Sequence, residues 1–126
     1  MRLLLDSHVA LWWLADDDQL GTACRAQLES ADEAFFSAVT PWELGIKRAL
    51  GRLDYPDGLG AALAAAGFVV LPISVAHGEL APSLPAHHRD PFGRMLVAQA
   101  QLESLALVTA DRTIRPYDIE LIDARL

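Results

Sequence analysis

Four acidic residues stand just after predicted strands or at the start of predicted helices: Asp6, Glu43, Asp90 and Asp111. Carboxylates that are brought together repel one another, so a cluster of them needs cations. Hard oxygen ligands of this kind favour Mg²⁺ or Mn²⁺. A pair of such ions can activate a water molecule and stabilise the leaving oxygen of a phosphodiester. The four acids are therefore candidates for metal-assisted phosphodiester hydrolysis, although they lie far apart along the chain.

Each of these acids also has a structural explanation. Glu43 would complete a capping box with Thr40 at the start of a helix. Asp90 is a good N-cap before a proline, and Asp111 is typical of a turn. Asp6 has the weakest alternative, because a buried strand rarely ends in an acid that has no cap, ion or partner. The pattern of four acids is stronger evidence than any one of them.

Two predicted helix starts have related sequences, "TPWE" at 40–43 and "DPFG" at 90–93. In each, a cap residue, a proline and an aromatic residue are followed by a fourth position in the first helical turn. By analogy with Glu43, position 93 is where a further acid would face the cluster. Glycine in a helix costs about 0.5–1 kcal/mol relative to alanine. Gly93 therefore marks either a missing ligand or a close approach to the backbone, and the sequence names no partner for such an approach.

The segments that must position these residues alternate regularly between two types. Apolar runs predict strands at 2–6, 33–39, 68–73, 105–112 and 119–124. Helical patterns cover 7–15, 21–31, 40–51, 56–67, 74–81 and 90–104, with Ser7 and Thr40 as expected N-caps. Continuous apolar strands separated by helices indicate an α/β fold, a three-layer α/β/α sandwich with a mostly parallel sheet of four to five strands. In such sheets, functional residues gather beyond the carboxyl ends of the strands.

Composition limits the classes of function. The 126 residues, 52% of them hydrophobic, predict a single domain over 1–126. The lone Cys24 is expected to be a small buried residue, and it leaves no disulfide framework or thiolate metal cluster. No apolar run is long enough for a membrane span, and no signal peptide is apparent, so we expect a cytoplasmic protein. A net charge of −7 excludes binding to nucleic acid by overall charge.

A nucleic-acid substrate would therefore need a local basic rim or bound metal ions. The candidates for such a rim are Lys47, Arg48, Arg52, Arg89, Arg94 and Arg112. A solvated helix face explains the same residues equally well. Trp12 and Trp13 are adjacent on one predicted helix and cannot both face the same core, so one of them is a candidate for an apolar groove that takes a dimer mate or a partner helix.

Taken together, these motifs resemble the PIN-domain ribonucleases, in particular the VapC toxins of bacterial toxin–antitoxin pairs. The resemblance covers nearly the whole chain and rests on the segments 3–14, 37–53, 87–100 and 105–114. It implies an α/β/α sandwich and Mg²⁺- or Mn²⁺-dependent cleavage of structured RNA such as transfer or ribosomal RNA. It also implies a homodimer that a small VapB-like antitoxin holds inactive, and no association with a membrane.

The resemblance also assigns roles to individual residues. Asp6, Glu43 and Asp111 match three acids of the family, and Asp6 would be the central metal ligand. Asp90 and Asp111 are the other expected ligands, and Glu43 would complete the shell or orient the attacking water. The expected supporting residues are Thr109, which would hold a carboxylate or a water, and Arg112.

Position 93 departs from the family pattern, which usually reads Asp-Pro-x-Asp-Arg in this stretch. Aligning the segment 95–100 with the family places its usual metal-binding acid at Gly93, so the resemblance implies a missing ligand. Asp90, three residues upstream, would partly substitute for it. The expected enzyme is then impaired or inactive at this position. Two alternatives remain open: a PIN-like scaffold that binds an antitoxin or RNA without cutting, and a phosphatase or DNA nuclease on a similar fold.

Overall fold

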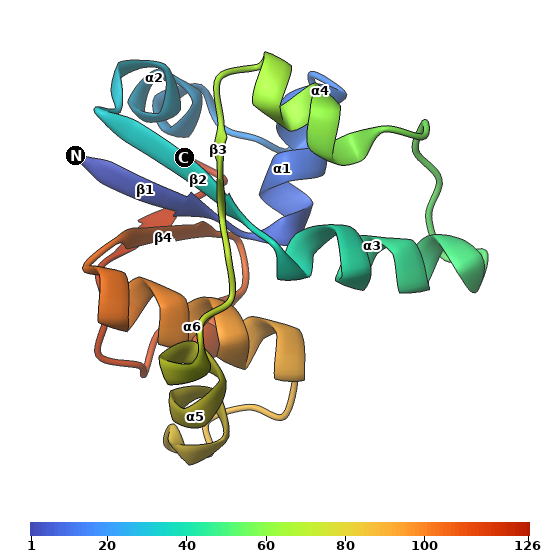
Figure 1. Ribbon diagram of the computed structural model, residues 1–126. Coiled ribbons are helices and arrows are strands. Elements are labelled where there is room, and N and C mark those ends of the chain that lie inside the picture. The colour runs from blue at the N-terminus through green and yellow to red at the C-terminus, as the bar shows by residue number, and fades with distance from the viewer.

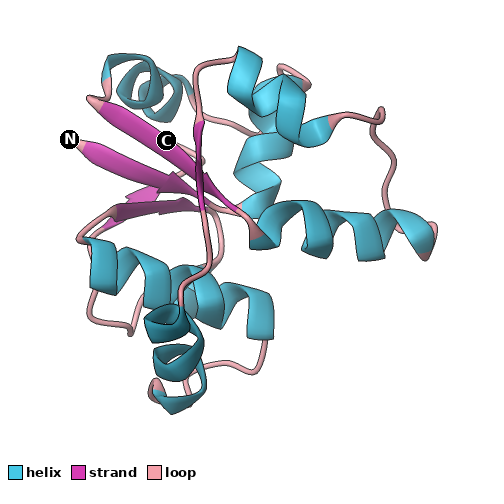
Figure 2. Ribbon diagram, in the orientation of Figure 1, coloured by secondary structure: helices cyan, strands magenta, loops and turns pink.

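Five short apolar segments form one parallel sheet in the computed structural model, which describes residues 1–126 (Figures 1 and 2). The strands are β1 (Arg2–Leu5), β2 (Glu33–Ser37), β3 (Val69–Leu71), β4 (Ala106–Thr109) and β5 (Leu121–Asp123). Their order in the sheet is β3-β2-β1-β4-β5, and every neighbouring pair is parallel. The predicted α/β class with a mostly parallel sheet of four to five strands is confirmed, and all five strands are parallel.

Six α-helices connect these strands. They are α1 (Ser7–Leu14), α2 (Thr22–Ser30), α3 (Val39–Ala49), α4 (Leu59–Ala65), α5 (Val75–Ser83) and α6 (Pro91–Glu103). Figure 1 shows α1, α2 and α4 on one side of the sheet and α5 and α6 on the other, while α3 extends away from the end of β2. None of these helices is both long enough and apolar enough to pass through a membrane.

The central strand β1 supplies side chains to two separate cores. Leu3 and Leu5 pack in the cluster that α1, α2 and α4 complete, whereas Leu4 packs in the cluster formed with α5 and α6. This division follows from the alternation of side chains along a strand. Because β1 is buried on both faces, its leucines form a continuous apolar run rather than an alternating pattern.

The register of the sheet brings distant segments to one edge. Leu5 of β1 lies opposite both Phe36 of β2 and Val108 of β4. Asp6 follows directly, and its backbone N–H donates to the carbonyl of Val108 at 2.9 Å. The residues that follow β1, β2 and β4 therefore meet at the carboxyl edge of the sheet.

Two predicted N-caps are wrong. Helix α1 begins at Ser7 with Asp6 in the cap position, and α3 begins at Val39 after Ala38, so neither Ser7 nor Thr40 caps a helix. Both hydroxyl side chains are buried and bind each other at 3.1 Å instead. Because α1 and α3 pack together, both hydroxyls are buried between the two helices. Buried polar groups need hydrogen-bond partners, and each hydroxyl finds its partner in the other.

Candidate active site

The four acids predicted from the sequence line one hollow at the carboxyl edge of the sheet. Asp6 follows β1, Glu43 lies in α3, Asp90 precedes α6 and Asp111 follows β4. All four line the same hollow of about 380 Å³. The other residues that line it are His8, Trp12, Lys47, Ala110 and Arg125. The fold thus brings together acids that are up to 105 positions apart in the sequence (Asp6 to Asp111).

Thr109 joins two of these acids. Its hydroxyl donates to Oδ2 of Asp6 at 2.6 Å and accepts from the backbone N–H of Asp111 at 3.0 Å. The carboxylate of Asp6 therefore has a fixed orientation, and the loop that carries Asp111 begins at a fixed point. Of the two roles expected for Thr109, to hold a carboxylate or a water, the structure shows the first.

The ionised form of Asp6 is unfavourable in this position. Burial raises the pKa of Asp6 above its ordinary value, and the nearby charge of Glu43 raises it further, against the opposing effect of the hydrogen bond from Thr109. A cation in the hollow would relieve both unfavourable effects. Asp6 is therefore the acid whose surroundings most favour an added positive charge.

Glu43 is buried and held at both oxygens. The hydroxyl of Ser7 donates to Oε1 at 2.6 Å, and Nζ of Lys47 donates to Oε2 at 3.0 Å. Ser7 has one hydroxyl proton, so Thr40 must donate to Ser7 in their 3.1 Å contact. The capping-box explanation of Glu43 is wrong, because its oxygens bind the side chains of Ser7 and Lys47 and not the backbone N–H of Thr40. Sequence reasoning missed this supporting role of Ser7, Thr40 and Lys47.

Asp90 caps a helix and also lines the acidic hollow. Its Oδ1 accepts from the backbone N–H of Phe92 at 3.0 Å, so it caps α6 as predicted. Its carboxylate also lines the acidic hollow. One oxygen is committed to the cap, and Oδ2 has no hydrogen-bond partner within the protein.

Asp111 likewise has a local structural role beside its place in the hollow. Its Oδ1 accepts from the backbone N–H of Thr113 at 2.9 Å and from the Thr113 hydroxyl at 2.7 Å. These bonds start the short 3-10 helix Arg112–Ile114. As in Asp90, one carboxylate oxygen organises the backbone and the other is free to face the hollow.

The donor set suits a hard cation. Carboxylate oxygens are the ligands that Mg²⁺ and Mn²⁺ prefer. No three His, Cys, Asp or Glu side chains lie close enough to share one ion in this arrangement. Mg²⁺ is commonly held by one or two carboxylates together with waters and phosphate oxygens. The acids therefore fit such an ion when water or substrate supplies the remaining ligands.

Comparison with known proteins decides the family. The sequence profile of the PIN domain matches residues 3–120, most of the chain. The chain belongs to the PIN-domain family. It is 31% identical over 122 residues to Ribonuclease VapC22 from Mycobacterium tuberculosis (strain ATCC 25618 / H37Rv), and the match covers 91% of each chain. The resemblance to VapC proteins that the sequence motifs indicated is confirmed.

Solved structures share the PIN-domain fold at low sequence identity. VapBC2 from Rickettsia felis, bound to a DNA fragment from its promoter, superposes with a TM-score of 0.70 at 11% identity, over 97% of this chain and 98% of that one. A toxin–antitoxin complex from Klebsiella pneumoniae gives 0.69 at 16% identity, over 97% of each chain. FitAcB from Neisseria gonorrhoeae gives 0.68 at 20% identity, over 98% of each chain.

Gly93 is a place of close approach in this PIN domain. A Cβ atom at position 93 would lie 2.7 Å from Nε2 of His88 and 3.2 Å from Oδ2 of Asp90. Nδ1 of His88 contacts the hydroxyl of Tyr117 at 2.8 Å, and Nε2 is buried without a partner. His88 is thus the partner that the sequence did not name. A side chain at position 93 would require the imidazole to move.

Three of the six residues considered for a phosphate-binding rim are engaged within the fold. Lys47 binds Glu43, and Arg48 binds Asp57 at 3.0 Å. Arg94 donates to backbone carbonyls of the segment 81–88, including that of Leu84 at 2.7 Å, and fastens this loop to α6. Arg52, Arg89 and Arg112 make no ion pair.

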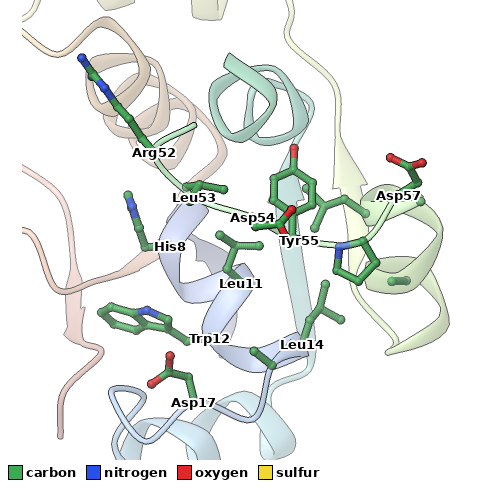
Figure 3. Close-up of a pocket in the computed structure, with 15 residues that line it drawn as sticks. His8, Leu11, Trp12, Leu14, Asp17, Arg52, Leu53, Asp54, Tyr55 and Asp57 are labelled. Carbon is green, nitrogen blue, oxygen red and sulfur yellow. The ribbon is translucent and has the colours of Figure 1, made fainter. Parts of the chain in front are cut away.

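A larger, mainly apolar groove of about 690 Å³ adjoins the acidic hollow (Figure 3). It lies between α1 and the segment that leads into α4, and Leu11, Leu14 and Tyr55 are among the residues that line it. Trp12 lines both this groove and the acidic hollow. Trp13 instead packs edge-on against Phe68, with ring centroids 5.4 Å apart. Both tryptophans pack against the core cluster of Leu3 and Leu5, so the expectation that they cannot face the same core is wrong. Trp12 alone also lines the groove, as was expected of one of the two.

Proposed function

We propose that this PIN domain is a metal-dependent endoribonuclease of the VapC toxin type, which cleaves a phosphodiester bond in structured RNA. The observation that carries the proposal is the convergence of Asp6, Glu43, Asp90 and Asp111 on one hollow. The name of the mycobacterial relative, a ribonuclease, supports the same reaction class. Phosphodiester hydrolysis needs an activated water and stabilisation of the leaving oxygen, and a carboxylate site with a divalent cation provides both.

The side chains divide this work between them. Asp6 and the free oxygens of Asp90 and Asp111 would hold Mg²⁺ or Mn²⁺, which when bound supplies water activation and neutralises charge on the phosphate. Thr109 fixes the direction in which the Asp6 carboxylate points. Glu43 is held in place by Ser7 and Lys47, facing the same hollow, and orients the attacking water.

A non-catalytic PIN scaffold is the second candidate, and the geometry at Gly93 favours it. The position that carries an acid in the expected family pattern is closed by His88 in this chain. In that case the hollow would bind RNA or an antitoxin without cutting. The two candidates differ in whether Asp90 supplies the charge that position 93 lacks.

RNA cleavage with Mn²⁺ or Mg²⁺ separates the two candidates. We expect the chain to cut structured RNA, Asp6→Asn to abolish cutting, and the exposed-site control Glu29→Gln to leave it unchanged. Excess EDTA should stop the reaction. If only a Gly93→Asp variant cuts, position 93 is a missing ligand and the natural chain is disabled. If neither the chain nor this variant cuts transfer or ribosomal RNA, the nuclease proposal is wrong.

Metal binding is measured independently of activity. We expect Mn²⁺ to raise the melting temperature, because a ligand that binds only the folded state stabilises it by about 2.7 kcal/mol at 100 times its Kd. Asp6→Asn should remove this increase and Glu29→Gln should retain it. An equal increase in both variants would show that the ion binds elsewhere.

The proposed partner is a small VapB-like antitoxin. Solved structures with this fold include a toxin–antitoxin complex, and the groove beside the acidic hollow presents Leu11 and Trp12 to a partner. An occupant of this groove would lie next to His8, which also lines both hollows, and would close the approach to the acids. Occupation of the groove is thus expected to inhibit cleavage.

A further inference from the structure

Half of the basic side chains of this acidic protein form ion pairs or hydrogen bonds with other groups of the chain, and half do not. Four of the ten Lys and Arg residues form ion pairs within the chain, and Arg94 is bound to carbonyls. The five that make neither kind of interaction are Arg52, Arg89, Arg112, Arg115 and Arg125. Three of these five line a single hollow.

This second hollow lies beside the end of β4 and has a volume of about 370 Å³. Arg112, Arg115 and Arg125 line it, and all three are exposed. The acidic side chains that face it are Asp111 and Asp123. Among the side chains that line it, positive charge exceeds negative charge by one, in a molecule whose net charge is −7, and Leu126 also lines it.

The arginine hollow shares part of its lining with the acidic one. Ala110, Asp111 and Arg125 line both. The guanidinium of Arg125 lies 5.3 Å from the ring centroid of Trp12, which lines the acidic hollow. This stacking holds Arg125 at the boundary between the two hollows.

The chemistry of the side chains selects a phosphate-bearing ligand. A guanidinium presents its N–H groups as a planar fork that matches two phosphate oxygens. An RNA strand whose scissile phosphate lies at the acids must pass its neighbouring phosphates over the surface next to them. Elsewhere around the acidic hollow the one other Lys or Arg side chain is Lys47, which is already bound to Glu43.

We propose that Arg112, Arg115 and Arg125 bind backbone phosphates of the RNA strand on one side of the scissile bond. They are positioning residues that set the direction in which the strand crosses the acids. This inference rests on the proposed ribonuclease function and names the substrate-binding surface of that same site. Phosphate contacts of this kind fix register and carry no base specificity of their own.

The test is the salt dependence of RNA binding, measured by fluorescence anisotropy with a labelled single-stranded RNA and Ca²⁺ as the cation. We expect Arg115→Gln to weaken binding about tenfold, which corresponds to the removal of one charged hydrogen-bond pair. The slope of log K against log salt should become shallower by about 0.7 for each phosphate of a single strand that is no longer neutralised. The double variant Arg115→Gln/Arg125→Gln should change the slope by about twice as much.

Arg2→Gln is the matched control. It removes the same charge at the opposite, amino edge of the sheet, where Arg2 pairs with Glu33, and should change neither the affinity nor the slope. Thermal melting of each variant shows whether removal of the guanidinium that stacks on Trp12 has altered the fold. In cleavage assays the arginine variants should raise KM and leave kcat nearly unchanged.

The outcomes separate this inference from the proposed function. If the unchanged protein neither binds nor cuts RNA, the proposed function fails and the inference fails with it. If it binds and cuts RNA but the arginine variants behave like Arg2→Gln, the ribonuclease proposal stands and the arginine hollow is not the phosphate path. A weaker affinity without a change in slope would also overturn the phosphate contacts, because it would indicate a structural effect.

Discussion

At the scale of single residues, the fold places Asp6 where its charge is costly. Burial, and then the charge of Glu43, keep the pKa of Asp6 above its ordinary value. A carboxyl group with a raised folded-state pKa contributes stability below its unfolded pKa, and this contribution is lost as the pH rises through the folded value. At neutral pH, ionised Asp6 therefore destabilises the protein in the absence of a cation.

Replacement of Asp6 by an uncharged residue of the same shape should stabilise the protein. We expect Asp6→Asn to raise the melting temperature at pH 7, because the amide has no charge for burial and Glu43 to destabilise. The amide oxygen still accepts from Thr109. The difference should shrink towards pH 4, where Asp6 itself becomes protonated. Calorimetry at both pH values checks this, and a lower melting temperature for Asp6→Asn at pH 7 would contradict it.

Gly93 and His88 should be energetically coupled. In most helices Gly→Ala gains up to about 1 kcal/mol, but here the new Cβ would meet Nε2 of His88 at 2.7 Å. We expect Gly93→Ala to destabilise the natural chain and to stabilise a His88→Ala background. A double-mutant cycle from urea unfolding measures the coupling. Equal effects of Gly93→Ala in both backgrounds would show that the imidazole moves aside without cost.

The residue scale is also where the sequence was least informative. The four acids could be predicted because Asp6 and Asp111 follow apolar runs that become strands, and Glu43 and Asp90 lie at the starts of helices. The bond between Asp6 and Thr109 depends on the register of β1 and β4, and the contact of His88 with Gly93 depends on how the loop 82–89 folds back. Local patterns contain neither. Arg115 and Arg125 were missed because nothing in their neighbouring residues distinguishes them from solvated surface charges.

At the scale of elements, the sequence predicted the existence of every strand and α-helix. Continuous apolar runs and helical patterns are local signals, so they survive without knowledge of the tertiary structure. The predictions of the N-caps failed. The hydroxyls of Ser7 and Thr40 can each bind either a nearby backbone N–H or a side chain of the neighbouring helix, and local sequence does not decide between them. Packing of α1 against α3 decided in favour of the partner, and Glu43 received a hydrogen bond as a result.

Helix α5 is fastened by a histidine that sequence reasoning left without a partner. Ser74 accepts from the N–H of His77, the ring Nδ1 of His77 accepts from the N–H of Ser74, and Nε2 contacts Glu103 of α6 at 3.0 Å. The imidazole of His77 is buried, whereas its partners Ser74 and Glu103 lie at the surface.

Removal of the His77 side chain should therefore lower the free energy of unfolding. We expect His77→Ala to destabilise the protein by about 2–3 kcal/mol, since it removes a buried ring, the imidazole half of the capping box and the contact with Glu103. Glu103→Gln, which keeps a hydrogen-bond acceptor for Nε2, should cost about 1 kcal/mol or less. Urea unfolding of the two variants checks the prediction, and similar costs for both would show that the cap contributes little.

At the scale of the whole molecule, α3 leaves apolar side chains in contact with solvent. Trp42 is 64% exposed and Leu50 is 62% exposed, and Ile46 lies between them at 37%. The spacing of four residues places the three on one face of the helix. A monomer gains nothing from this surface, whereas a second copy of the chain would bury it.

We expect the chain to be a homodimer and Leu50→Glu to weaken the dimer. A charge placed in an apolar interface is desolvated without a partner, so dissociation should increase at least tenfold. Light scattering after size-exclusion chromatography gives the mass of each form. The matched control is Val75→Glu, which introduces the same charge at an exposed apolar residue on α5. A dimer that is unaffected by Leu50→Glu would place the interface elsewhere.

The central position of β1 has a consequence for the order in which the site is completed during synthesis. Asp6 leaves the ribosome long before Thr109, which orients it and follows 103 residues later. Strand β1 also lacks one of its two neighbours until β4 has been made. A nascent or truncated chain that ends before residue 106 therefore carries Asp6 and Glu43 without Thr109 or Asp111. The proposed chemistry becomes available only after β4 has been synthesised, so we expect chains that stop before this strand to lack it.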